Sequence, residues 1–106
     1  MRMQIGNLFT DSEPPRDGER VDALLTHRNL VIERIISSAD FASKEYVQSQ
    51  DEWVVLMSGA AVLQISGQRV SLKAGDYLFL PAHTPHTVEQ ASSGALWLAV
   101  HLHPTA

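Results

Sequence analysis

The stretch that decides the fold is Gly75-Asp76-Tyr77-Leu78-Phe79-Leu80-Pro81-Ala82-His83-Thr84-Pro85-His86-Thr87-Val88-Glu89. Gly75 provides the backbone freedom that a tight turn needs, and Pro81 marks a strand end because proline cannot donate a ladder hydrogen bond. Pro85 pushes the residue before it toward extended geometry. We therefore predict a short strand that ends before Pro81 and a new strand that begins at His86.

Short apolar segments lie on both sides of this stretch, and glycine-containing turns separate many of them. Such closely and regularly spaced segments are typical of an all-β sandwich or barrel. For residues 20–28 a helix remains an alternative, because that segment holds few strong β-formers. The predicted strands cover residues 21–26, 30–36, 53–57, 61–65, 69–72 and 95–103.

Length, charge and cysteine content limit the classes of function. The 106 residues fit one domain (1–106), with an N-terminal arm at 1–20 and a barrel at 21–103. The absence of cysteine and of a long apolar run favours a cytoplasmic protein that is neither exported nor inserted in a membrane. A formal net charge of -4 without a basic stripe argues against nucleic acid and membrane surfaces as partners, which leaves small molecules and protein surfaces.

The spacing of several residues resembles the two-part signature of the cupin family, over about residues 40 to 90. Glu52 and Gly59 match the second half of the first motif, and Gly75, Pro81 and His86 match the second motif. The resemblance implies an all-β, double-stranded β-helix, which is a jelly-roll-like barrel, and agrees with the strand pattern.

The chain also departs from the signature at positions that bear on chemistry. Asp40 replaces the leading glycine of the first motif, and Tyr46 and Gln48 replace its two histidines. In the second motif His83 replaces a glycine and Gln90 replaces the asparagine. Metal-binding members of the family use the two histidines, the glutamate and the later histidine, so the resemblance implies a metal site that is altered at two of four positions.

Two uses of the cavity remain open. In the first, the barrel binds a small polar ligand through a hydrogen-bonded cluster that contains Tyr46, Gln48, Glu52 and His86. In the second, a divalent transition metal (Zn, Fe, Mn or Ni) serves a cupin enzyme of the dioxygenase or isomerase type. Its predicted ligands are His86, Glu52, His83 and His101. His101 is included because residues 95–103 alternate, so that the last strand can carry it into the barrel. No catalytic residue is assigned.

Other residues receive structural interpretations. We expect Arg34 to form an ion pair with Glu33 or Glu45 on a sheet face. We also expect a homodimer, formed through outer sheet faces or an exchanged N-terminal strand. The aromatic residues expected in the core are Trp53, Tyr77 and Trp97. The apolar residues considered for the dimer contact are Val31, Ile35 and Leu8-Phe9.

Overall fold

Most of the strands begin and end at the glycine, proline and polar turns that the sequence indicates. The computed structural model describes residues 3–105, which contain no helix and therefore none long and apolar enough to cross a lipid bilayer. The helical alternative for residues 20–28 is wrong, because this segment pairs with the next one in an antiparallel hairpin. The strands are β1 (Glu19–His27), β2 (Leu30–Ser37), β3 (Glu45–Tyr46), β4 (Asp51–Ser58), β5 (Ala60–Ile65), β6 (Gln68–Lys73), β7 (Tyr77–Leu80), β8 (His86–Ala91) and β9 (Ala95–Leu102).

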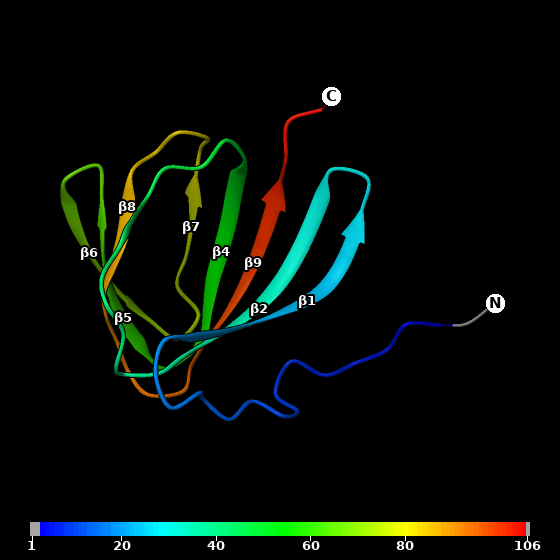
Figure 1. The fold of residues 1–106 in the computed structure, drawn as a ribbon, viewed down its shortest axis with the longest axis horizontal. Coiled ribbons are helices and arrows are strands. Elements are labelled where there is room, and N and C mark those ends of the chain that lie inside the picture. Colours follow the sequence, from blue (N-terminus) through cyan, green and yellow to red (C-terminus); the bar gives the residue numbers. More distant parts are fainter. Residues whose placement is uncertain (1–2, 106) are drawn as a thin grey trace.

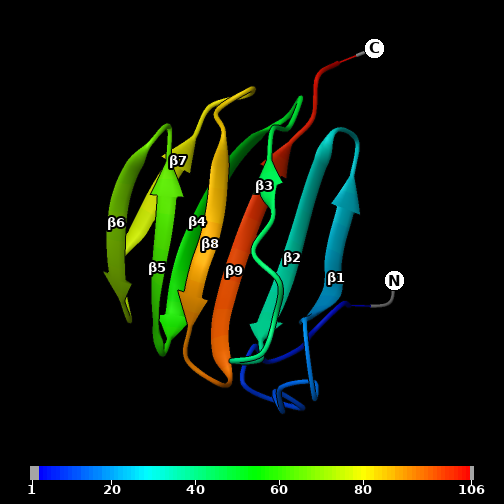
Figure 2. The ribbon, with the colours of Figure 1, turned by 60° about the vertical axis from the view of Figure 1, so that its left-hand side comes forward.

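The strands form two antiparallel sheets that face each other. The five-stranded sheet has the order β1-β2-β9-β4-β7, and the four-stranded sheet has the order β3-β8-β5-β6. Figure 1 shows the two sheets as the opposite walls of one curved structure. Figure 2 shows β8 and the short β3 in front of β9 and β2. The predicted all-β double-sheet architecture is confirmed.

The apolar core lies between β4 and β9 on one sheet and β5 and β6 on the other. Leu56 and Ala99 from the first sheet meet Leu63 and Leu72 from the second, and all four are buried. Fully burying a leucine side chain contributes about 1.5–3 kcal/mol. This core holds the sheets together at one side of the barrel. At the other side, the inner faces of β1 and β2 are separated from β3 and β8 by a cavity.

An arginine on the outer face fastens the N-terminal arm to the barrel. Arg34 is buried, and its guanidinium donates hydrogen bonds of 2.6 and 3.0 Å to the Asp22 carboxylate on the neighbouring strand β1. It also donates to backbone carbonyls of the arm, among them that of Leu8 at 2.9 Å. The predicted ion pair with Glu33 or Glu45 is wrong, because the β1–β2 register places Asp22 directly opposite Arg34.

Two of the three aromatic residues expected in the core lie outside it. Trp53 is 37% exposed and Tyr77 is 67% exposed, and their rings contact each other on the outer face of the five-stranded sheet. The apolar run in β4 has no alternation, so its sequence does not tell which residues face inward. Trp97, by contrast, is buried as predicted, and its indole nitrogen donates a 3.0 Å hydrogen bond to the Ser37 hydroxyl.

Two residues considered for a dimer contact face the interior. In the β2–β9 ladder Val31 lies opposite His101, and Ile35 lies opposite Trp97. Directly opposed residues share a face of the sheet, and Ile35 lines the cavity together with Trp97. Neither Val31 nor Ile35 is therefore part of the outer face.

Candidate functional site

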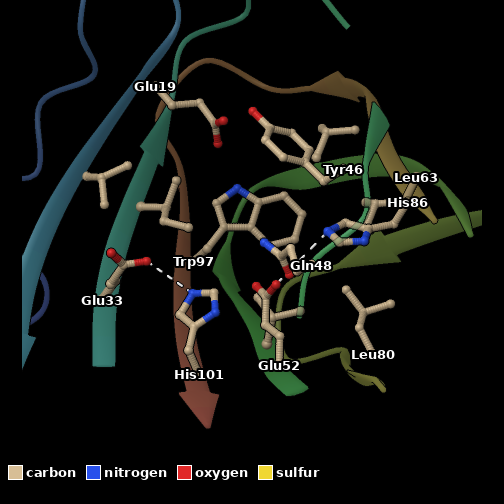
Figure 3. A pocket seen from close by; sticks show the side chains of 14 residues that line it. Glu19, Glu33, Tyr46, Gln48, Glu52, Leu63, Leu80, His86, Trp97 and His101 are labelled. Carbon is tan, nitrogen blue, oxygen red and sulfur yellow. Dashed lines mark ion pairs between the residues drawn. The ribbon is translucent and has the colours of Figure 1, made fainter. Parts of the chain in front are cut away.

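A partly open cavity between the two sheets collects most of the predicted site residues. Its volume is about 200 Å³. The five-stranded sheet and the strands β3, β5 and β8 of the other sheet all contribute side chains, and Figure 3 shows the polar ones directed toward a common space. The lining residues are Glu19, Val21, Glu33, Ile35, Tyr46, Gln48, Glu52, Val54, Leu63, Leu80, His86, Val88, Trp97 and His101.

Glu52 and His86 face each other across the cavity. Glu52 is 7% exposed and His86 is 8% exposed, and the Nε2 atom of His86 lies 4.0 Å from Oε1 of Glu52. Burial raises the pKa of Glu52, although the imidazoles of His101 and His86 act in the opposite direction. The two residues that the sequence places at the centre of the site are thus brought together.

The backbone next to His86 determines which of its ring nitrogens carries a proton. Nδ1 lies 2.9 Å from the carbonyl oxygen of Thr84. A carbonyl can only accept, so Nδ1 is the donor in this hydrogen bond. In the neutral imidazole Nε2 then presents a lone pair to the cavity, and it faces the Glu52 carboxylate as a second acceptor.

Tyr46 and Gln48 also line the cavity, as predicted from their place in the first motif. Tyr46 is 39% exposed, and its ring stacks on the imidazole of His86 with centroids 5.9 Å apart. A phenol and an amide can each donate and accept hydrogen bonds without carrying a charge at neutral pH. They add neutral polar contacts near the Glu52–His86 pair.

His101 enters the cavity from β9, where it meets a carboxylate that the sequence analysis did not assign to the site. Nε2 of His101 lies 3.0 Å from Oε1 of Glu33, and Nδ1 lies 3.4 Å from the Gln50 amide nitrogen. Glu19 is the other carboxylate that was missed, because it was assigned to the N-terminal arm. Glu33 could have been found from its phase in β2, which it shares with the inward-facing Ile35.

His83 does not line the cavity. It is exposed in the turn between β7 and β8, and its backbone has a left-handed φ of 67°. This is the position at which the family has a glycine, and glycine adopts such a conformation without strain. The motif position therefore reflects a backbone requirement, which this exposed histidine meets.

The donors present do not fit a divalent metal. Of the family's four ligand positions only Glu52 and His86 hold a strong ligand, since a glutamine carbonyl is a weak neutral ligand and a phenol must lose its proton to bind well. His101 is engaged with Glu33. Within residues 3–105, no three His, Cys, Asp or Glu side chains are grouped so that they could hold a metal ion.

Two antiparallel sheets around a cavity with an apolar lining and a few polar groups define a class of small double-stranded β-helix proteins. The family model for the cupin domain matches residues 36–103. The chain therefore belongs to the cupin family, as its motifs indicate. No curated protein matches the sequence.

Solved structures agree with this assignment. A protein from Ralstonia eutropha JMP134, named as a candidate mannose-6-phosphate isomerase, is 35% identical with a TM-score of 0.84, over 96% of this chain and 100% of its own. An RmlC-like cupin from Shewanella frigidimarina is 18% identical with a TM-score of 0.75, over 96% of each chain. KdgF from Halomonas sp. is 18% identical with a TM-score of 0.75, over 94% of this chain and 96% of its own. The last two support the fold alone.

Proposed function

We propose that this protein binds a small polar molecule in the barrel cavity, with Glu52 and His86 as the main contacts and without a bound metal ion. The observation that carries this proposal is the 4.0 Å approach of two buried acceptors at the cavity wall. A ligand amine placed between them can donate to both, and a ligand hydroxyl can donate to one of them. The cavity is smaller than the roughly 300–1,000 Å³ that is usual for drug-sized ligands, which favours a compact molecule.

The other walls of the cavity suit a molecule with one polar edge and one apolar face. Leu63, Leu80 and Val54 provide apolar contact beside the polar groups, and the indole of Trp97 forms part of the wall. Its hydrogen bond to Ser37 restrains the orientation of this ring. Such a combination of apolar lining and a few convergent polar groups is usual for small-molecule sites.

The alternative is a metal-dependent cupin enzyme of the isomerase or dioxygenase type with His86 as a metal ligand. It has support from the name of the Ralstonia relative, which refers to an isomerase of a sugar phosphate. Against it stands the chemistry of Tyr46 and Gln48 at the two histidine positions, and we derive no catalytic step. Metal analysis of untagged protein after supplementation separates the two: less than about a tenth of a transition metal per chain supports metal-free binding, and a stoichiometric metal overturns it.

The two tryptophans offer a direct test of binding. The indole of Trp97 lies in the cavity wall and that of Trp53 on the outer face, so their separate indole NMR signals report on the inside and the outside of the barrel. The probes are uncharged sugars, amino sugars, sugar phosphates and amino acids. We expect at least one probe to shift the Trp97 signal in a saturable way and to leave the Trp53 signal unchanged.

Variants then assign the binding to the proposed residues. Glu52→Gln and His86→Ala should each weaken the binding of the probe by roughly tenfold or more, because the first replaces a charged acceptor with a neutral amide and the second removes the imidazole acceptor. The control is His83→Asn, which keeps a residue that tolerates the left-handed conformation and lies outside the cavity. A probe that binds both cavity variants as tightly as the parent protein, or no shift of Trp97 by any probe, overturns the proposal.

A further inference from the structure

The cavity wall formed by the five-stranded sheet is rich in carboxylates. Glu19 from β1, Glu33 from β2 and Glu52 from β4 all line it, and none of the lining residues in the described chain is a lysine or arginine. Two arginines do occur on β1 and β2. Arg20 and Arg34 both hydrogen-bond to an aspartate on the opposite, outer face of the sheet. The positive charges of these strands are therefore directed away from the cavity.

The three carboxylates are unequally compensated. Glu33 has His101 as a partner at 3.0 Å. Glu52 is more than nine-tenths buried, yet within residues 3–105 its carboxylate forms no hydrogen bond, and Nε2 of His86, an acceptor, lies 4.0 Å from it. Glu19 forms no ion pair with any residue of the described chain. Two of the carboxylates thus remain available to a positively charged or hydrogen-donating group in the cavity.

The pKa shifts of Glu19 and Glu52 also favour a positively charged group in the cavity. Burial raises the pKa of Glu52, and partial burial followed by the negative charge of Glu52 raises the pKa of Glu19. Both groups are therefore stabilised by an added positive charge. A phosphate or carboxylate group of a ligand would instead bring a further negative charge next to them.

Resting on the function proposed above, we infer that the ligand is a small hydroxylated amine that binds as a cation, and that phosphorylated and carboxylated molecules are excluded. The ammonium group lies beside the buried Glu52 on the carboxylate wall, where the charge of the more exposed Glu19 also acts on it. A hydroxyl group donates to Nε2 of His86, which presents a lone pair to the cavity. With a cavity of about 200 Å³, the molecule has the size of a single sugar ring or less.

The experiment compares probes that share a ring and differ in charge. Glucosamine, glucose and glucose 6-phosphate, together with the corresponding mannose series, are titrated at a pH at which the amine is protonated, and the Trp97 indole signal is followed. We expect the amino sugar to bind more tightly than the neutral sugar by about threefold to tenfold, and the sugar phosphate not to bind. The preference for the amine should decrease as salt is added.

Glu19→Gln tests the role of the carboxylate that has no partner. We expect this variant to lose most of the preference for the amino sugar over the neutral sugar, whereas Glu45→Gln, on β3 but outside the cavity lining, should keep it. A sugar phosphate that binds as tightly as the amino sugar overturns this inference and leaves the proposed function standing. If no probe, here or in the first test, shifts the Trp97 signal, both this inference and the proposed function are overturned.

Discussion

Gly59 and Gly75, the two glycines retained from the family motifs, allow a test of whether backbone conformation or close packing requires glycine at each position. Both have a left-handed backbone, with φ of 92° at Gly59 and 93° at Gly75. They differ in their surroundings. A Cβ atom at Gly59 would lie 2.6 Å from the Ser92 hydroxyl oxygen and 3.0 Å from Cα of Ala95, whereas a Cβ at Gly75 would meet nothing within 4 Å.

The magnitudes follow from these distances. Alanine in the left-handed conformation costs about 1–2 kcal/mol, and the reduced freedom of the unfolded chain returns about 0.4–1 kcal/mol. Gly75→Ala should therefore lower the free energy of unfolding by about 1 kcal/mol. At Gly59 overpacking adds about 1–3 kcal/mol, since the Ser92 hydroxyl cannot move away without losing its 3.0 Å hydrogen bond from the Ala60 amide. We expect Gly59→Ala to cost about 3 kcal/mol.

Urea denaturation measures this difference. With an m-value of about 1–1.5 kcal/mol/M for a chain of this length, the unfolding midpoint of Gly59→Ala should lie roughly 1–2 M below that of Gly75→Ala. Each substitution adds only a Cβ atom, so the m-values of the two variants should agree. Equal midpoints, or a lower midpoint for Gly75→Ala, would refute the explanation that close packing against Ser92 and Ala95 sets Gly59 apart.

Three further predictions concern charge and strain. Because burial raises the pKa of Glu52, its ionised form lowers the stability of the fold above that pKa, and this cost disappears as pH falls toward about 4. Glu52→Gln should therefore be more stable than the parent protein at pH 7. Urea midpoints of the variant and the parent that do not converge at low pH would contradict this. Arg34→Met should lower the free energy of unfolding by about 3 kcal/mol and speed proteolysis within residues 3–18, since it removes the donors to Asp22 and the arm. An unchanged rate of cleavage within the arm would show that Arg34 does not hold the arm on the barrel. His83→Gly should retain or raise thermal stability, by at most about 1 kcal/mol, because it relieves the left-handed strain; a clear loss would assign the side chain a role.

The strand pattern was predictable because glycine and proline act locally. Gly75 and Pro81 determine where β7 begins and ends through their own backbone restrictions, whatever the distant chain does. The phase of each strand was predictable only where polar and apolar residues alternate. Residues 95–103 alternate, and Trp97 and His101 indeed lie on the inner face together. The run Trp53–Met57 does not alternate, so the outward direction of Trp53 required the structure.

The site was predictable as far as the motif spacing extends. The approach of Glu52 and His86 follows from their places in the two motifs, but the partners supplied by other strands do not. Glu33 and Glu19 reach the cavity only through the pairing of β1, β2 and β9. His83 was interpreted as a ligand because a sequence does not distinguish a histidine selected for its imidazole from one at a position with a special backbone conformation.

The charge of the cavity is ultimately a consequence of strand register. Glu33 and Arg34 are neighbours in β2, and adjacent residues of a strand point to opposite faces. In the observed register Glu33 meets His101 inside the barrel and Arg34 meets Asp22 outside it. A slip of one residue would reverse both directions, placing the guanidinium inside a cavity that would then attract anions. The Asp22–Arg34 ion pair and the contacts of Arg34 with the arm stabilise the observed register, so a structural interaction on the outer face helps to keep Glu33 on the inner face and Arg34 out of the cavity.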